Sequence, residues 1–352
     1  MDSGVSMSVT ILDDRPARLS FAIALAVVFA VGVVGLGALG PMRVHLPSGI
    51  PAAVHAPDAG AGASQKGLPT ARLIALFDAE RAHKHVHHLS HTMGRRPPGS
   101  SEERLAADYI EAELKGWGWD TLRQDSIPVS GTALKTQNVS ATHATDSGRS
   151  VVIVGAHYDS SGLPAPSRGA SDNGSGVGVV LELARVMRHA NLPYELRLVF
   201  FGGEEAGKES PGTHHTGSMY YLDRLGEDQR ANVLAMVSVD MVGAGSTLCA
   251  SRVGYGSDRA RQCLLASAER LQLDVKTNSG TNRSDHEAFE SAGIPAVWLT
   301  RLVRDPRRQT TGDTAGQVRK QALVESGRLV VRFLMMNAER HTARACALAA
   351  VG

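Results

Sequence analysis

The sequence predicts an α/β fold, with a mostly parallel mixed β-sheet between layers of helices and an N-terminal transmembrane helix ahead of it. Short β-branched runs alternate with helical stretches at Val151–Val154, Leu196–Phe201, Val233–Val239 and Ala296–Leu299. Such alternation is typical of parallel strands joined by crossover helices. The uncharged apolar run over residues 19–40 is long enough to cross a bilayer as a helix.

Composition and charge narrow the class of protein. The 352 residues include 37 lysines and arginines against 35 aspartates and glutamates, so no global field favours nucleic acid. The hydrophobic fraction of 43% supplies the core of one folded domain. The cysteines at 249, 263 and 346 form no short metal-binding pair. A disulfide between Cys249 and Cys263 requires an oxidising compartment, and buried thiols are the alternative.

The N-terminal segment decides the expected compartment. We expect a cytoplasmic segment, an uncleaved membrane anchor, a tether and a folded domain outside the cytoplasm, at residues 1–18, 19–40, 41–69 and 70–345. A cleavable signal peptide is the alternative, and it would give a secreted form. Its apolar stretch is usually about 7–15 residues long and follows a basic segment. Here Asp13 and Asp14 dilute Arg15 and Arg18 in the leading segment.

Helices are expected before the first strand. Apolar residues from Leu73 to Leu89 and from Leu105 to Leu114 recur at helical spacing on either side of the breaker Pro97-Pro98-Gly99. Five histidines between residues 83 and 91 are spread around the first helix and do not share one face. We therefore expect them on the surface.

Polar side chains follow the predicted strands at their carboxyl ends, where open α/β sheets bind ligands. The residues at these ends are His157, Asp159, Glu204, Glu205 and Asp240. Asp159 is placed to hold the imidazole of His157 through its second nitrogen, a contact that changes metal affinity or activity about 10–100-fold. Glu204 and Glu205 repel each other unless a positive charge lies beside them, and a metal ion supplies that charge.

A further carboxylate opens the helix after the first of these strands. Asp172 lies in the small-residue stretch Gly169–Gly176. An aspartate at a helix start is ordinarily a cap. The glycines around it, however, let the carboxylate approach another group closely, as a bridging metal ligand must.

This combination of residues predicts a zinc site that hydrolyses an amide without a covalent enzyme intermediate. Zinc held by imidazole and carboxylates lowers the pKa of a bound water to about 7 and polarises a carbonyl. The expected metal ligands are His157, Asp172, Glu205 and Asp240. We expect Glu204 to accept the proton of the water as general base.

The pattern resembles the co-catalytic dizinc exopeptidases typified by bacterial leucyl aminopeptidase, whose relatives include glutamate carboxypeptidase and glutaminyl cyclase. The resemblance extends over residues 77–331 and includes the Pro98-Gly99-Ser100 turn and the Ser284-Asp285-His286 stretch. It implies a zinc aminopeptidase-like fold. It also implies that Asp285 and His286 lie beside the site without binding metal.

The resemblance also implies how the ligands divide. Asp172 would bridge two zinc ions, His157 and Asp240 would complete one site, and Glu205 would serve the other. Members of this family supply the last ligand as a histidine in a His-Thr-x-x-Asp-Thr stretch, and here Gln309 stands in its place. An amide oxygen is a poorer zinc ligand than imidazole, so one ion is an alternative to two.

A lengthened loop after Glu205 offers substitute ligands. The stretch from Lys208 to Thr216 adds His214 and His215, and we treat replacement of the missing ligand by one of them as a hypothesis. A plain surface loop is the alternative.

The leading functional prediction is a membrane-tethered, periplasmic or extracellular zinc aminopeptidase that acts on peptides. A carboxypeptidase would need a basic cluster for a free carboxylate, and Arg301, Arg304, Arg307 and Arg308 are available. A glutaminyl cyclase-like enzyme is a third choice, against which Gln309 counts. A non-catalytic binding module with an impaired metal site is the fourth. The oligomeric state is left unpredicted.

Overall fold

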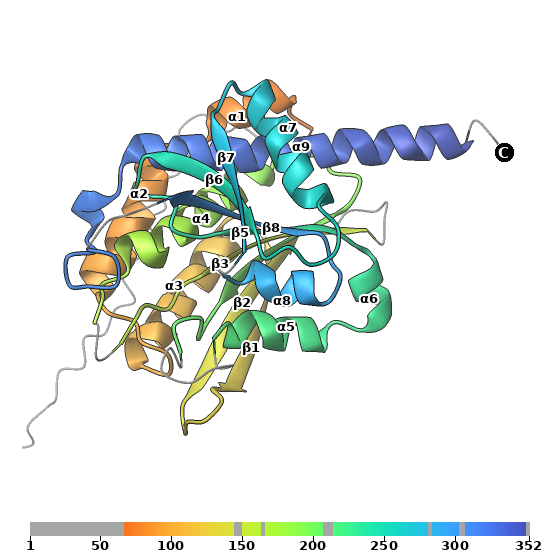
Figure 1. Ribbon diagram of the computed structural model, residues 1–352. Helices are drawn as coiled ribbons and strands as arrows, with labels where there is room; N and C mark the ends of the chain where they lie inside the picture. The colour runs from red at the N-terminus through yellow and green to blue at the C-terminus, as the bar shows by residue number, and fades with distance from the viewer. Residues whose placement is uncertain are drawn as a thin grey trace, which may run out of the picture. The chain divides into compact units, whose positions relative to one another are not determined.

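The computed structural model describes residues 67–143, 150–162, 166–206, 214–280, 284–302 and 307–349 (Figure 1). The predicted cytoplasmic segment, the predicted transmembrane helix and most of the predicted tether lie outside these residues. Within them, no helix has both the length and the apolar character that crossing a membrane requires.

In this part of the chain, eight strands form one sheet. The strands are β1 (Asp120–Pro128), β2 (Lys135–His143), β3 (Val151–His157), β4 (Glu195–Phe201), β5 (Val233–Val239), β6 (Thr247–Arg252), β7 (Val275–Ser279) and β8 (Ala296–Leu302). The α-helices are α1 (Thr70–Leu76), α2 (Ala79–His87), α3 (Ser101–Gly116), α4 (Ser175–Met187), α5 (Thr216–Arg224), α6 (Glu227–Ala231), α7 (Arg259–Arg270), α8 (His286–Ser291) and α9 (Lys320–Ala349). Shorter helical turns are η1 (His88–Met93), η2 (Ala170–Gly174) and η3 (Ala315–Gln317).

The strands lie in the order β1-β2-β4-β3-β5-β8-β6-β7. The central strands β4, β3, β5 and β8 are parallel, as is the β6–β7 pair, whereas β1–β2, β2–β4 and β6–β8 are antiparallel. The mostly parallel mixed sheet is therefore confirmed. Strands β1, β2, β6 and β7 were not predicted, because their sequences mix polar with apolar residues.

The two faces of the sheet carry separate cores, because successive side chains of a strand point to opposite faces. On β3, Val152 and Val154 belong to the larger core, which includes α4 and α9. Val151 and Ile153 belong to a smaller core with residues of α5 and α8. Figure 1 shows α9 on one side of the sheet and α5 and α8 on the other. Both faces are buried, which explains why the central strands are continuous apolar runs.

The order in which parallel strands are added to the sheet reverses at β3. Strands β4 and β5 lie on either side of β3, and the connecting helices α4 and α5 belong to cores on opposite faces. A sheet with such a switch opens a crevice beyond the carboxyl ends of its strands. His157, the last residue of β3, lies at this crevice.

The start of α4 lies directly against the end of β5. A Cβ atom on Gly176 would lie 2.1 Å from the carbonyl oxygen of Val239 and 2.4 Å from Oδ1 of Asn173. No side chain fits there, so glycine is required for this approach. The helix predicted from residue 169 begins instead at Ser175, because η2 has non-helical backbone angles at Asp172 and Asn173.

One expectation for the N-terminal helices was wrong, and the expected surface position of the histidines is confirmed for His87 and His91 but wrong for His85. The first helix is divided into α1 and α2, and the carboxylate of Asp78 caps α2 by accepting the backbone N–H of Glu80 at 2.7 Å. His85 is buried, with Nδ1 2.6 Å from the hydroxyl oxygen of Tyr109. Because α2 packs against both α4 and α9, more than one stripe of it is covered.

Cys249 on β6 and Cys263 on α7 are both free and buried. The thiol of Cys249 lies 3.4 Å from the hydroxyl of Ser251, and Sγ of Cys263 accepts a hydrogen bond from Asn337 at 3.3 Å. The buried-thiol alternative therefore describes these two residues.

Candidate functional site

His157, Asp172 and Asp240 meet beyond the carboxyl edge of the sheet. His157 ends β3, Asp240 follows β5, and Asp172 lies in η2 ahead of α4. The Nε2 atom of His157 is 3.2 Å from Oδ1 of Asp172 and 3.4 Å from Oδ1 of Asp240. All three side chains are buried. We call His157, Asp240 and Oδ1 of Asp172 the His157 side of the centre.

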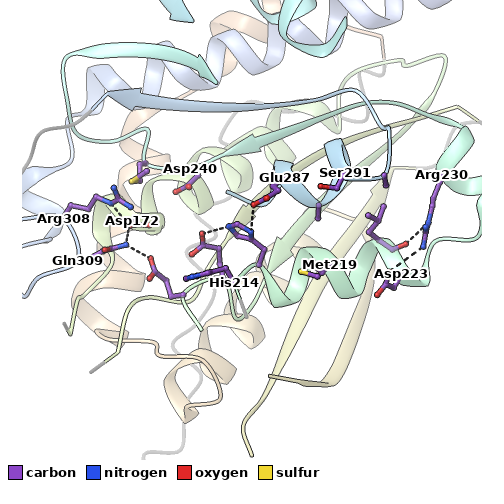
Figure 2. A pocket seen from close by; sticks show the side chains of 17 residues that line it. Asp172, His214, Met219, Asp223, Arg230, Asp240, Glu287, Ser291, Arg308 and Gln309 are labelled. Atoms are coloured by element: carbon purple, nitrogen blue, oxygen red, sulfur yellow. Dashed lines mark hydrogen bonds and ion pairs between the residues drawn. The ribbon is translucent and has the colours of Figure 1, made fainter. Parts of the chain in front are cut away.

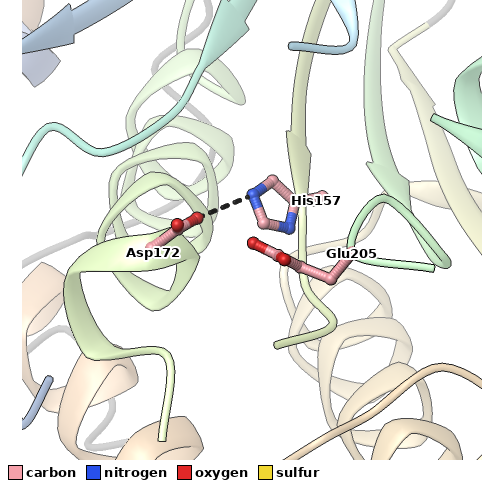
Figure 3. A group of neighbouring side chains, drawn as sticks. All are labelled: His157, Asp172 and Glu205. Atoms are coloured by element: carbon pink, nitrogen blue, oxygen red, sulfur yellow. Dashed lines mark ion pairs between the residues drawn. The ribbon is translucent and has the colours of Figure 1, made fainter. Parts of the chain in front are cut away.

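Glu205 reaches the same centre from the turn after β4. One ligand atom from each of His157, Asp172 and Glu205 lies within 4.8 Å of the others (Figure 3). The amide Nε2 of Gln309 donates to Oε1 of Glu205 at 3.2 Å and to Oδ2 of Asp172 at 3.3 Å. Nε of Arg308 donates to the same Oδ2 at 3.3 Å. We call Glu205, Arg308, Gln309 and Oδ2 of Asp172 the Gln309 side.

The donor set of the His157 side fits zinc. Nε2 of His157 and Oδ1 of Asp240 are buried atoms that make no hydrogen bond within the described ranges. Buried polar atoms are nearly always satisfied, so two such atoms facing each other point to a missing partner. One imidazole nitrogen and carboxylate oxygens are ligands that zinc prefers in proteins.

The charges of the centre favour a cation. Burial alone would lower the pKa of His157, yet the surrounding carboxylates, Glu204 foremost, raise it well above its usual value. Burial alone would raise the pKa of Glu204, but the imidazoles of His157 and His215 lower it to about 2. Burial raises the pKa of Asp240 in spite of His157. Glu204 is thus ionised near neutral pH, the state that a general base requires.

Asp159 ties the two strand ends together. Its Oδ1 atom lies 3.4 Å from Nδ1 of His157 and accepts the backbone N–H of Glu204 at 3.2 Å. Its Oδ2 atom accepts the backbone N–H of Glu205 at 2.8 Å. One buried carboxylate therefore orients the imidazole and the turn that carries both glutamates. The predicted contact between Asp159 and the second nitrogen of His157 is present in the structure.

Asn173 is a positioning residue that the sequence analysis missed. Its amide donates to the carbonyl oxygen of Val239 at 3.0 Å, while its Oδ1 accepts the backbone N–H groups of Gly176 at 2.9 Å and Met241 at 3.2 Å. These bonds join η2 and α4 to the end of β5. The position beside Asp172 was the only signal in the sequence.

Asp313 fixes the backbone of Asp172 from the opposite direction. Its carboxylate accepts the backbone N–H of Ser171 at 2.7 Å and that of Asp172 at 3.1 Å. Burial raises the pKa of Asp313 to about 6, against the opposing effect of these two N–H groups. Sequence analysis noted Asp313 only as part of the stretch that contains Gln309, and it gave the residue no role.

Arg96 is a buried guanidinium that shapes the loop before η2. It donates to the carbonyl oxygen of Tyr158 at 2.9 Å, of Arg168 at 2.9 Å and of Gly169 at 3.1 Å. The side chain thus connects the segment after β3 to the segment that delivers Asp172. Arg96 belongs to no recognised motif, so the sequence analysis did not predict its role.

A cavity of about 740 Å³ opens from the centre (Figure 2). Asp172, Asp240, Arg308 and Gln309 lie together at one end, and the chain's acidic residues Glu204 and Glu205 line the same cavity. The other end has apolar walls that contain Met219, Leu222, Ala288 and Ala292. It ends at an ion pair of 3.9 Å between Asp223 and Arg230.

The two histidines of the lengthened loop lie at this cavity. Nε2 of His215 is 3.4 Å from Oε1 of Glu204, and its Nδ1 is 3.5 Å from Oε2 of Glu287. His214 lines the cavity, with its ring centroid 6.0 Å from that of His215. Among the described residues, the metal-type cluster consists of His157, Asp172 and Glu205 and includes neither histidine. The substitute-ligand hypothesis stays a prediction.

Asp285 and His286 lie close behind the centre. Burial raises the pKa of Asp285 to about 7, against the opposing charges of His157 and His215. His286 is buried and stacks on Trp298 with ring centroids 5.8 Å apart. The place of these two residues beside the site stays a prediction, because Glu287 and Ala288 are the residues of this segment that line the cavity. Glu287 was missed.

Residues 138–334 match the family model described as Peptidase family M28. The chain belongs to peptidase family M28. Aminopeptidase YwaD of Bacillus subtilis (strain 168) is 32% identical over 189 residues, which are 51% of this M28 chain and 39% of that protein. Leupeptin-inactivating enzyme 1 of Streptomyces exfoliatus is 30% identical over 290 residues, 80% of this chain and 58% of that protein. The chain thus spans less than two thirds of the length of either relative.

A solved structure shares the fold. The aminopeptidase from Aneurinibacillus sp. strain AM-1 matches with a TM-score of 0.68 at 21% identity, over 77% of this chain and 96% of that chain. The predicted α/β fold and the resemblance to zinc exopeptidases are therefore confirmed.

Proposed function

We propose that this M28 protein is a zinc-dependent aminopeptidase that removes N-terminal residues from peptides. The observation that carries the proposal is the place of Glu204, an ionised carboxylate that lines the same cavity as Asp172 and Asp240. The name of the Bacillus subtilis relative, an aminopeptidase, supports the same class.

The residues around Glu204 support hydrolysis by water. When bound, zinc polarises the scissile carbonyl and acidifies the attacking water. Glu204 takes the proton of that water and passes it to the leaving amine. His215, 3.4 Å from the carboxylate of Glu204, holds it in place. Water attacks directly, so no covalent enzyme intermediate forms.

The charge of the cavity favours substrates with a free amino terminus. The carboxylates of Asp172, Glu204, Glu205 and Asp240 stand against the single guanidinium of Arg308 at this end. Glu287 adds a fifth carboxylate, and His215, whose pKa Glu204 raises against the effect of burial, adds a positive charge, so with one divalent ion and the guanidinium one net negative charge remains. Such a field attracts an ammonium group and repels a carboxylate. The apolar walls near Met219 and Leu222 favour a first residue with an apolar side chain.

A carboxypeptidase receives less support. Of the four arginines considered for binding a carboxylate, Arg308 lines the cavity. Arg301 is buried and donates to Glu325 and to the carbonyl oxygen of Val242. Arg304 lies outside the described residues.

The test uses the full chain loaded with zinc and a set of peptides in matched pairs. Each pair has the same sequence, with a free amino terminus in one member and an acetylated one in the other. We expect release of the first residue only from the free peptides, fastest when that residue is apolar. Trimming from the carboxyl end would indicate a carboxypeptidase, and ring closure of N-terminal glutamine would indicate a cyclase. Zinc-loaded protein that turns over none of these peptides would indicate a non-catalytic binding module.

We propose also that residues 19–40 anchor the protein in a membrane, with residues 70–345 outside the cytoplasm. The uncharged apolar run and the tether behind it support this arrangement. Fractionation and protease treatment of intact cells test it, since the domain is expected in the membrane fraction and open to the protease. Recovery of a soluble form that lacks residues 1–40 would contradict the anchor and indicate a cleaved signal peptide.

A further inference from the structure

We infer that the protein binds a single metal ion, on the His157 side, and that Arg308 and Gln309 fill the position of a second ion on the Gln309 side. The inference deepens the proposed function and rests on it, because it takes the centre to be metal-dependent. It departs from the two-ion arrangement that the family resemblance implies.

The amide of Gln309 lies between two carboxylates. Its Nε2 atom donates to Oδ2 of Asp172 at 3.3 Å and to Oε1 of Glu205 at 3.2 Å. Because both partners are acceptors, the amide faces them with its NH₂ group in this arrangement. An NH₂ group has no lone pair to offer a metal. Gln309 therefore occupies one oxygen of each carboxylate on this side, Oδ2 of Asp172 and Oε1 of Glu205.

Arg308 adds a full positive charge at the same place. Its Nε atom is 3.3 Å from Oδ2 of Asp172, and Asp172 is itself 97% buried while Arg308 is about half exposed at the mouth of the cavity. Figure 2 shows Arg308 and Gln309 side by side against Asp172. A second divalent ion on Oδ2 would lie next to a guanidinium, and the two like charges would repel each other.

The turn that carries these two residues is built to present them. Gln309 adopts a left-handed backbone conformation, with φ of 55°. The backbone N–H and the hydroxyl of Thr310 both donate to the carbonyl oxygen of Arg307, at 3.0 and 2.6 Å. Asp313, at the end of the turn, holds the backbone N–H of Asp172. The turn is thus fastened both to itself and to the carboxylate that it faces.

The His157 side offers the opposite environment. No donor from the chain bonds Nε2 of His157 or Oδ1 of Asp240 in the described structure. The two oxygens of Asp172 therefore face different partners: Oδ1 faces Nε2 of His157, which also lies 3.4 Å from Oδ1 of Asp240, and Oδ2 faces two donors. The carboxylate of Asp172 thus offers Oδ1 to a metal on the His157 side, while its Oδ2 bonds Arg308 and Gln309 on the other side.

Metal content of the full chain tests the inference directly. The protein is equilibrated with excess zinc, freed of loose ions by gel filtration and analysed by mass spectrometry of the metal. We expect one zinc per chain. Two zinc ions per chain would overturn the inference and leave the proposed function intact. No zinc would overturn both the inference and the metal-dependent function.

Two isosteric variants locate the ion. Asp240→Asn changes a carboxylate of the His157 side, and Glu205→Gln changes one of the Gln309 side. We expect zinc content to fall from one equivalent to nearly none in Asp240→Asn and to stay at one in Glu205→Gln. The reverse result would place the ion on the Gln309 side and refute the assignment. Circular dichroism and thermal unfolding confirm that each variant folds.

A gain of a second ion tests the role of Arg308 and Gln309. The variant Gln309→His supplies an imidazole, and the double variant Arg308→Met, Gln309→His also removes the guanidinium. We expect the double variant to bind two zinc ions per chain, while the control Arg308→Met, Gln309→Leu stays at one. A double variant that still binds one ion would show that these two residues do not keep the second ion out.

Discussion

The two sides of the centre share one carboxylate but differ in what faces it. On the His157 side, a histidine and an aspartate come from the ends of β3 and β5, and strand geometry fixes both. On the Gln309 side, donors arrive from a turn between β8 and η3. Sheets keep their geometry when sequences diverge, whereas loops accept substitutions easily. The difference teaches why our inference places the single ion on the side that the strand ends build and leaves the side that the turn builds without one.

The largest expected effect separates Glu204 from its neighbour Glu205. Glu204→Gln removes the proton acceptor, and we expect kcat to fall about 10²–10⁴-fold with zinc still bound. Steady-state kinetics and metal analysis of the same preparation check both parts. Glu205→Gln is the matched control, and we expect a smaller loss because Glu205 lies on the Gln309 side. Equal losses in the two variants would break the comparison.

A smaller effect is expected behind the His157 side. Asp159→Asn keeps the shape of the side chain but leaves one acceptor oxygen for contacts that now use two. We expect zinc affinity or kcat/KM to fall about 10–100-fold, as is typical for residues that orient a metal ligand. Competition with a zinc chelator measures the affinity. The control is Asp108→Asn. Asp108 is partly exposed and pairs with Arg123, so this change should alter neither quantity.

The hydrogen bonds of Asn173, which connect η2 to the end of β5, should contribute to the free energy of unfolding. Asn173→Ala removes three hydrogen bonds among buried groups, and we expect the free energy of unfolding to fall by about 1–3 kcal/mol. Urea unfolding of metal-free protein measures it without the contribution of zinc. An unchanged midpoint would mean that η2 reaches its position without this side chain.

The smallest effect at neutral pH concerns His286, which belongs to neither side. Burial lowers the pKa of His286 to about 3, from 6.5 in the unfolded chain. Between these values the unfolded state binds a proton that the folded state does not. Stability should therefore fall as the pH falls from about 6.5, by up to roughly 1.4 kcal/mol per pH unit from this residue.

In the variant His286→Phe, the free energy of unfolding should fall less steeply as the pH drops below about 6.5. At pH 7.5 the slope of stability against pH should be the same as in the wild type. Unfolding in urea with a chelator present, at pH 7.5, 6 and 5, measures the slope. The exposed His87→Phe serves as control. Parallel curves for His286→Phe and the wild type would exclude this source of acid sensitivity.

Much of the centre was predictable because strand ends are visible in a sequence. The apolar runs of β3 and β5 lead directly to a polar residue and that of β4 does so after two glycines, so His157, Glu204 and Asp240 were expected together. Strands β1, β2, β6 and β7 were missed because their polar residues break the pattern. The residues that position the centre, Asn173 among them, were missed because a backbone hydrogen bond leaves no spacing or period in the sequence.

The tight contact at the start of α4 has one more consequence. Val239 immediately precedes Asp240, and Gly176 is four positions after Asp172, with only a hydrogen atom between the helix and the strand. A methyl group at residue 176 would act as a wedge between these two segments. The missing side chain at residue 176 thus allows the segments that carry the two aspartates to lie in direct contact.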